Sequence, residues 1–406
     1  MLQSIEIKNF RSCQDVRLRL GDPVIALLGK NGAGKTNVLH AIQTAADLCV
    51  GNLETSLNLY PRDPQKPTGF VLEFVLGTSL IVYRIDRSGI SSSQDIFRET
   101  LEKNNSILYL RIGESATALD SDLPDNIRIG SQSSTLPLLL QILPLDHKLV
   151  VELYPIASYL RAIRYYPLLQ GFQEHFTGPQ SRNNLGEAEG SMSPYIEAGY
   201  YKTWKSKLAE GTARRSVQMR LLHLSLTDKD KFDELKDLLG SNGLGLIDDI
   251  RVDEVRSVTR IHATKPDEIS DTVYSIKFMP GKGLAGAGNL YRFNGLSAGT
   301  WRILQLLTYL IFDTNSCMLL EQPEDSIHPG LLAKVIDILR TYSGRTQLIC
   351  TTHSPRVMNL VGPAGIRLVT AEEGLTKVSE LSSQDQQAAK GYLEDHGTLA
   401  EFLETL

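Results

Sequence analysis

Hydrophobic and polar residues alternate along the first 40 residues in a pattern that predicts three strands followed by a helix. Residues 2–10 and 16–20 alternate with a period of two, as half-buried strands do. The apolar run at 23–28 predicts a buried strand, and residues 37–50 predict a helix. Residues 68–86 predict a hairpin that turns at 77–79. The chain therefore begins as an α/β domain.

The pattern changes from about residue 95. Residues 100–240 combine polar loops with leucine-rich stretches that are typical of helices, such as 149–169 and 200–226. Residues 247–263 and 272–280 predict strands, and strand–helix alternation returns from residue 291 after a glycine-rich link. We therefore predict one α/β domain, split into residues 1–95 and 285–406. A mostly helical insert at 96–284 would serve dimerisation or bind a partner or DNA.

Composition changes this picture little. With 406 residues, 42% hydrophobic and 22% charged, the chain has the composition of an ordinary globular protein. A net charge of −5 gives no overall basic signature of a nucleic-acid binder. Apolar runs are shorter than a membrane helix needs, and the N-terminal residues lack the core of a signal peptide. Four cysteines without a paired motif predict a reduced, cytoplasmic protein with no membrane contact.

A phosphate-binding loop follows the third predicted strand. The stretch "GKNGAGKT" at 29–36 matches G-x-x-x-x-G-K-[ST] between a strand and a helix, which is the context the motif requires. Its glycines let backbone amides point at phosphate oxygens, Lys35 reaches the β- and γ-phosphates, and the Thr36 hydroxyl binds Mg²⁺. The predicted ATP-binding residues here are Gly29, Asn31, Gly32, Ala33, Gly34, Lys35, Thr36 and Asn37.

A second anion site is predicted at the start of a later apolar helix. In "LSAGT" (296–300), Ser297 is a natural N-cap, and Ala298 and Gly299 leave the helix amides uncovered. Alone, this stretch would be a plain capped helix. Its place between the phosphate loop and the apolar strand at 316–321 favours a nucleotide-binding motif.

The order of these motifs resembles the ABC-type ATPase heads of the SMC, RecF and OLD families, and most of all stand-alone ATPases with an OLD-type head. The opening "IEIKNFRS", the stretch "PEDSIHPG" and the long insert carry the resemblance to that branch. The motifs cover roughly residues 1–45 and 290–360, and the insert resembles no family. The implied fold is a P-loop NTPase with a mixed central sheet, flanking helices and an antiparallel β subdomain.

The resemblance also implies a head-to-tail homodimer. ATP held by Lys35 and Thr36 of one copy would be covered by Ser297 and Gly299 of the other. His353, in "TTHSP" after an apolar strand, corresponds to the residue that senses the γ-phosphate. Arg11 corresponds to an arginine near the nucleotide, although an ordinary surface arginine is an equal alternative.

The stretch "EQPE" departs from the pattern of these families, in which two adjacent acids end the strand. Glu321 takes the position that holds Mg²⁺, and Gln322 takes the position that activates the attacking water. An amide can orient water but cannot accept its proton. Gln322 is a replacement that traps ATP, or Glu324 supplies the base, or the protein is a natural switch with little turnover. ATP binding needs no base and should persist, whereas loss of the base should slow hydrolysis.

Two functions fit such a clamp. The first is a sensor and scaffold in anti-phage defence that acts on a separate nuclease or toxin, because only about 50 residues follow "HSP" and no nuclease motif is present. The second is a RecF- or SMC-like repair clamp on duplex DNA. For it, Arg214, Arg215 and Arg220 would form a phosphate-contacting helix face, although a solvated face is the simpler interpretation.

Overall fold

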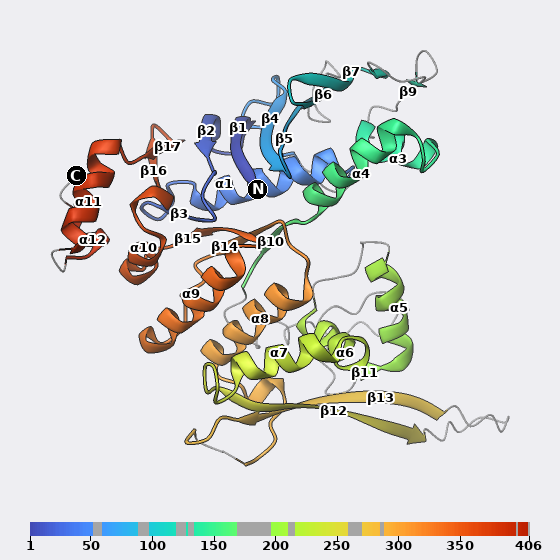
Figure 1. The fold of residues 1–406 in the computed structure, drawn as a ribbon, viewed down its shortest axis with the longest axis vertical. Helices are drawn as coiled ribbons and strands as arrows, with labels where there is room; N and C mark the ends of the chain where they lie inside the picture. The colour runs from blue at the N-terminus through green and yellow to red at the C-terminus, as the bar shows by residue number, and fades with distance from the viewer. Residues whose placement is uncertain are drawn as a thin grey trace. The chain divides into compact units, whose positions relative to one another are not determined.

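The computed structural model describes residues 1–51, 59–87, 97–118, 127–128, 134–168, 196–209, 216–258, 270–284, 288–394 and 397–404. It divides into two compact units (Figure 1). Unit 1 comprises Met1–Pro167, Asn315–Glu324 and Ile336–Leu406, and unit 2 comprises Leu168–Thr314 and Asp325–Val335.

A parallel sheet forms the centre of unit 1. Its strand order is β10-β14-β15-β3-β16-β17, and only β17 runs antiparallel to its neighbour. The strands are β3 (Val24–Leu28), β10 (Ile163–Tyr166), β14 (Cys317–Glu321), β15 (Gln347–Thr351), β16 (Ile366–Glu372) and β17 (Leu375–Glu380). The carboxyl ends of β3, β14 and β15 therefore lie at one edge, where ligands bind in such sheets.

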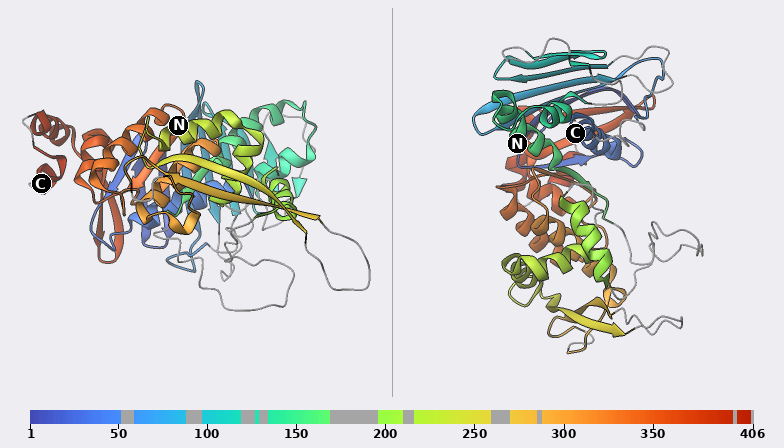
Figure 2. Two further views of the ribbon diagram at one scale, coloured as in Figure 1. Left: turned by 90° about the horizontal axis from the view of Figure 1, so that it is seen from below. Right: turned by 90° about the vertical axis from the view of Figure 1, so that its right-hand side faces the viewer.

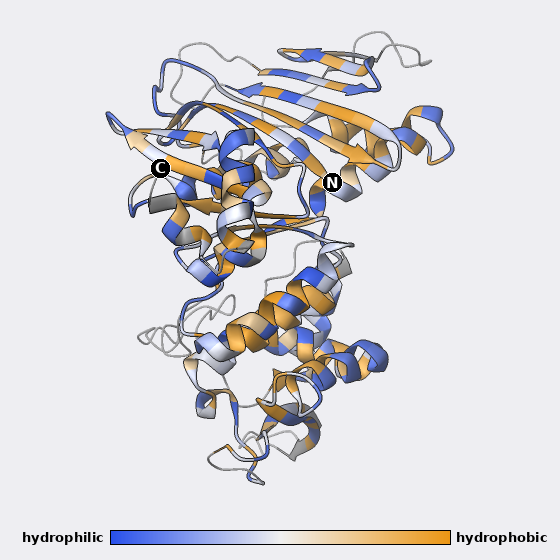
Figure 3. Cartoon of the chain, turned by 60° about the vertical axis from the view of Figure 1, so that its left-hand side comes forward, coloured by the Kyte–Doolittle hydropathy of each residue, from blue (hydrophilic) through white to orange (hydrophobic). Residues whose placement is uncertain are grey.

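An eight-stranded antiparallel sheet, in the order β2-β1-β4-β5-β6-β7-β8-β9, forms the second sheet of unit 1. Its strands are β1 (Leu2–Phe10), β2 (Cys13–Arg19), β4 (Thr68–Leu76), β5 (Ser79–Arg87), β6 (Phe97–Lys103), β7 (Ser106–Ile112), β8 (Ser115–Ala118) and β9 (Ile127–Arg128). Hydrophobic and hydrophilic residues alternate along many of its strands (Figure 3). The predicted hairpin at 68–86 is confirmed, with its turn at Gly77, which has a φ of 58°.

Helix α1 (Lys35–Cys49) contacts strands of both sheets, and its apolar face lies in the main hydrophobic core. The remaining helices of unit 1 are α3 (Thr135–Ile142), α4 (Lys148–Arg161), α10 (Pro355–Val361), α11 (Ser383–Glu394) and α12 (Leu399–Glu404), with the 3-10 turn η3 (Pro363–Gly365). Helix α9 (Pro329–Ser343) begins in unit 2 and ends in unit 1. Because α1 packs on both sheets, its first turn, which follows the phosphate loop, has a fixed place.

Unit 2 combines helices with a small sheet in the order β11-β13-β12. Figure 2 shows the long antiparallel pair that β12 and β13 form. The elements are β11 (Ile196–Glu197), α5 (Ala198–Ala209), α6 (Val217–Thr227), α7 (Lys229–Leu239), β12 (Ile247–Val258), β13 (Ser270–Pro280), η2 (Phe293–Gly295) and α8 (Ala298–Phe312). Helix α8 is buried along most of its length and packs on α6 and α7.

These units differ from the predicted split at residues 95 and 285. Strand β6 pairs with β5 and continues the antiparallel sheet, so residues 97–118 and 127–128 extend a head sheet and are not helical. Residues 288–314 belong to unit 2 because α8 packs on α6 and α7. The insert is mixed α/β, since it contains the long paired strands β12 and β13 as well as helices.

Candidate functional site

The loop between β3 and α1 has glycine where a side chain would not fit. A Cβ on Gly34 would lie 1.9 Å from Oγ1 of Thr376, and one on Gly29 would lie 2.0 Å from the carbonyl oxygen of Val369. Gly32 and Gly34 also have φ values of 81° and 100°, which favour glycine. The loop is therefore pressed against β16 and β17, and its shape depends on these glycines.

Lys35 is the first residue of α1 and is only 7% exposed. Its ammonium donates to the carbonyl oxygens of Gly29 (2.7 Å) and Lys30 (3.1 Å), so the loop curls around it. Burial lowers the pKa of Lys35, and the nearby Glu321 carboxylate opposes that shift. The positive charge thus lies inside a ring of backbone at a helix N-terminus, which is a setting that favours phosphate.

The two predicted metal ligands are brought together from distant parts of the chain. The Thr36 hydroxyl, in the first turn of α1, donates to Oε1 of Glu321 at the end of β14 over 2.5 Å. A hydroxyl and a carboxylate beside a phosphate-binding loop are hard oxygen donors of the kind Mg²⁺ prefers. The residues present therefore fit a magnesium ion bound through Thr36 and Glu321.

A third group, Tyr165 on β10, completes this cluster, and sequence reasoning missed it. Its hydroxyl donates to the other carboxylate oxygen of Glu321, Oε2, over 2.7 Å. Its backbone N–H donates to the side chain of Gln43 on α1 (2.6 Å), and its ring lies 4.8 Å from that of His40. Burial, followed by the hydrogen bond to Glu321, raises the pKa of the Tyr165 phenol, so this group remains a donor.

Arg11 lies against the first turn of α1. Its guanidinium donates to the side-chain oxygen of Asn37 (3.3 Å) and stacks over the rings of Phe10 and Tyr60. Its backbone has a φ of 49°, and its N–H donates to the carbonyl of Tyr60. These contacts hold Arg11 beside the first turn of α1, and its role at a nucleotide stays a prediction.

Gln322 follows β14 in a left-handed backbone conformation, with a φ of 42°. Its N–H donates to both the carbonyl oxygen and the hydroxyl of Thr351, each at 3.1 Å. Such a conformation costs a non-glycine residue about 1 kcal/mol or more, and it recurs at functional sites. The turn after β14 is therefore held in one geometry by the neighbouring strand β15.

Glu324 connects this turn to the segment that contains His353. Its Oε1 accepts hydrogen bonds from the Thr352 hydroxyl (2.6 Å) and the His353 N–H (2.9 Å). Its Oε2 is buried and has no hydrogen-bond partner within the described part of the chain. The His353 side chain itself is exposed. One carboxylate oxygen of Glu324 is thus anchored while the other remains able to accept a proton or a hydrogen bond.

The second predicted anion site lies in unit 2, at the start of α8. Ser297 caps the helix by accepting from the N–H of Thr300 over 3.1 Å, and both Ser297 and Ala298 are exposed. A Cβ on Gly299 would lie 2.4 Å from the carbonyl oxygen of Ser326, so only glycine fits there. The exposed helix N-terminus can accept an anion from outside this unit.

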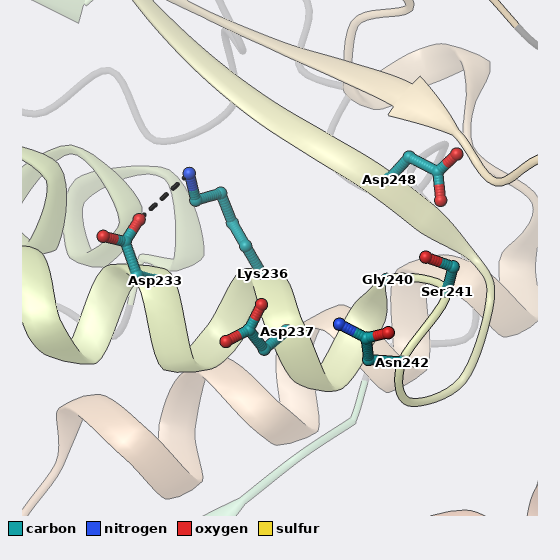
Figure 4. A pocket seen from close by; sticks show the side chains of 7 residues that line it. All are labelled: Asp233, Lys236, Asp237, Gly240, Ser241, Asn242 and Asp248. Atoms are coloured by element: carbon teal, nitrogen blue, oxygen red, sulfur yellow. Dashed lines mark ion pairs between the residues drawn. The ribbon is translucent and has the colours of Figure 1, made fainter.

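A separate polar hollow at the end of α7 matches none of the predicted residues (Figure 4). It is lined by Asp233, Lys236, Asp237, Gly240, Ser241, Asn242 and Asp248. Lys236 pairs there with Asp233 over 3.0 Å. Across the residues that the structure describes, no group of three or more His, Cys, Asp or Glu side chains could hold a metal ion.

Comparison with known proteins agrees with this geometry. Residues 1–54 match the family "AAA ATPase domain", and residues 284–359 match "AAA domain, putative AbiEii toxin, Type IV TA system". The chain is 46% identical over 65 residues to the OLD nuclease of Thermus scotoductus. It is 39% identical over 46 residues to the DNA replication and repair protein RecF of Acholeplasma laidlawii.

These alignments cover 16% and 11% of the chain, and only 11% and 13% of the two relatives. A solved Smc head bound to the C-winged helix domain of ScpA superposes with a TM-score of 0.50. It is 15% identical, and the superposition covers 94% of this chain and 98% of that one. Together these similarities support an ATPase head of the SMC/RecF/OLD type.

In an SMC/RecF/OLD-type head the phosphate loop implies nucleotide binding, and the predicted resemblance and α/β P-loop fold are confirmed. The basic helix face predicted to contact DNA is not confirmed. Arg220 is 1% exposed and forms a buried ion pair with Asp313 over 3.1 Å. Arg214 and Arg215 lie outside the described residues. Within the described residues, no helix is long and apolar enough to span a membrane.

Proposed function

We propose that this protein binds ATP with Mg²⁺ and that ATP closes two copies into a homodimer. The observation that carries the proposal is the junction of Thr36 with Glu321 beside the buried ammonium of Lys35. That cluster in unit 1 supplies the phosphate and metal ligands, whereas Ser297 in unit 2 presents a second, exposed helix N-terminus. A second copy is the source of the group that covers the γ-phosphate.

Different groups of the site bind the phosphates and the metal ion. Loop amides and Lys35 hold the β- and γ-phosphates, and Thr36 and Glu321 hold the metal, which when bound neutralises phosphate charge. Ser297 and Gly299 of the second copy donate to the γ-phosphate. Because each copy then contributes to both sites, ATP stabilises the dimer by mass action.

Hydrolysis is slow in this proposal. Gln322 takes the position next to Glu321, and its amide orients water without accepting a proton. Glu324 is the second candidate base, since its Oε2 is buried without a partner and its Oε1 is tied to the His353 N–H. His353 is exposed and contacts the γ-phosphate when the dimer closes. The protein therefore stays closed long enough to hold a partner.

Complementation between two variants tests the composite site. Ser297→Arg should bind ATP as a monomer and fail to dimerise, whereas Lys35→Ala should do neither. Their mixture should form heterodimers with one intact site, visible by light scattering coupled to size exclusion. The charge-neutral control Thr300→Val should dimerise with ATP. ATP-dependent dimers of Ser297→Arg alone, equal to wild type, would contradict the proposal.

For the cellular role we propose a scaffold in anti-phage defence that holds a separate nuclease or toxin. The support is the match of residues 284–359 to a family whose description names a toxin system, and the similarity to an OLD nuclease. Purification from the native operon with ATP should capture that effector, and the Lys35→Ala variant should lose it. If the effector is captured equally with and without ATP, then effector binding does not depend on the ATP-closed dimer.

A DNA-repair clamp is the second candidate. Helix α5 carries Lys202, Lys205 and Lys207 and no acidic residue, and Lys202 and Lys205 are exposed. The RecF similarity points the same way. Binding to duplex DNA that needs ATP and weakens with salt, and that Lys202→Glu with Lys205→Glu abolishes, would favour this role. If the protein does not bind duplex DNA even at low salt, the DNA-repair role is excluded.

A further inference from the structure

Tyr165 occupies an unusual place beside the metal ligands. It lies on β10, next to β14, and pairs in register with Leu319, two residues before Glu321. Its hydroxyl donates to Oε2 of Glu321 while the Thr36 hydroxyl donates to Oε1. Each carboxylate oxygen therefore has its own donor, which leaves the Glu321 carboxylate a single orientation.

Two contacts from α1 hold Tyr165 in place. The side chain of Gln43 accepts from its backbone N–H at 2.6 Å, and the ring of His40 lies against its ring. Gln43 is itself bound by its amide to Asp47 over 2.7 Å. The helix that follows the phosphate loop thus fixes the tyrosine, and the tyrosine fixes the carboxylate.

We propose that Tyr165 is a positioning residue of the magnesium site, and that its phenol sets the affinity of the ATP-bound protein for Mg²⁺ by orienting Glu321. The inference rests on the proposed function, since it assigns Thr36 and Glu321 to the metal. Partners of metal-ligating carboxylates typically change metal affinity by 10–100-fold when removed. Tyr165 makes no contact with phosphate in this role and acts only through Glu321.

Neighbouring Tyr166 provides a matched control. It sits one residue further along β10, is fully buried, and donates to the side chain of Asn315 over 2.7 Å. Loss of its hydroxyl removes a buried hydrogen bond on the same strand without touching Glu321. A purely structural effect of β10 on the site would therefore be the same in Tyr165→Phe and Tyr166→Phe.

The test is a Mg²⁺ titration of the binding of a fluorescent ATP analogue to the full chain. In Tyr165→Phe the half-saturating Mg²⁺ concentration should rise about tenfold. Analogue binding in EDTA and the melting temperature without nucleotide should stay at the wild-type values. Tyr166→Phe should keep the wild-type Mg²⁺ dependence. In a Glu321→Gln background, Tyr165→Phe should add no further shift.

Several results would overturn the inference. A half-saturating Mg²⁺ concentration within twofold of wild type in Tyr165→Phe would do so. An equal shift in Tyr166→Phe, or a full tenfold shift that persists in the Glu321→Gln background, would assign the effect to the fold of β10. Failure of the proposed function looks different, because wild type itself would then bind the analogue without any dependence on Mg²⁺.

Discussion

Replacing Gln322 by glutamate tests the central chemical expectation for this site. The two side chains have nearly the same shape, and the Gln322 backbone is held at a φ of 42° by two hydrogen bonds to Thr351. The substitution therefore leaves the turn in place, while the side chain gains a negative charge and the ability to accept a proton. Any change in turnover then reports on the missing base.

The expected magnitude follows from general-base catalysis. A positioned base contributes a factor of about 10² to 10⁴, or about 3–5 kcal/mol of barrier. Gln322→Glu should raise the steady-state ATPase rate by this factor if no other base acts. If Glu324 already accepts the proton through its buried Oε2, the increase should stay below about tenfold, and Glu324→Gln should lower the rate of the native chain.

The assay is phosphate release under saturating ATP and Mg²⁺, with four proteins measured in parallel. They are wild type, Gln322→Glu, Glu324→Gln, and Gln322→Glu combined with Lys35→Ala. The last of these removes nucleotide binding, so activity that persists in it belongs to a contaminant. ATP affinity should be equal in the first three, because binding needs no base.

One outcome refutes the reasoning directly. If Gln322→Glu binds ATP and dimerises like wild type but hydrolyses no faster, and Glu324→Gln is also unchanged, then neither residue limits turnover. The slow step would then be dimer opening or product release, and single-turnover measurements would locate it.

Three further predictions concern the framework of the site. Gly34→Ala should abolish ATP binding, measured by fluorescence, because its Cβ would lie 1.9 Å from Oγ1 of Thr376. Glu99→Ala should lower the free energy of unfolding by about 3 kcal/mol in urea titrations, since the fully buried carboxylate accepts from two phenols and the first turn of α3. Arg220→Met should cost about 3–5 kcal/mol by stranding the buried charge of Asp313, and a stability equal to wild type would contradict the ion-pair assignment.

The parts of the site that could be predicted are those encoded by neighbouring residues. The glycines, Lys35 and Thr36 stand in one eight-residue stretch whose spacing identifies them. Glu321 ends an apolar run, and the resemblance to related ATPase heads implies its metal-binding role. Ser297 is likewise recognisable as an N-cap from the residues after it. The close approach of Thr36 to Glu321 follows from parallel strands whose carboxyl ends meet at one edge.

Features that depend on distant pairing could not be predicted. Tyr165 lies in a stretch whose leucine spacing favours a helix, and only its pairing with β14, some 150 residues later, makes it part of a strand. From the sequence, Arg220 is expected to be a surface arginine. In the structure it is buried and pairs with Asp313, which is 93 residues away. Strand β6 alternates in burial with a period of two, but one of its buried positions is Glu99. Strand β7 contains the continuous apolar run 107–110, so neither strand shows a clear alternation of apolar and polar residues.

The order of strands in the parallel sheet has a consequence for synthesis. Strand β3, which carries the phosphate loop, pairs only with β15 and β16 among the described strands. At 5–20 residues per second, the ribosome needs roughly 15–60 s between completing β3 and completing β15. Most strands of the antiparallel sheet, by contrast, pair with a near neighbour in sequence and can form as they emerge. The nascent strand β3, whose residues are apolar, therefore stays unpaired in its own sheet during this interval, as a segment that chaperones can bind.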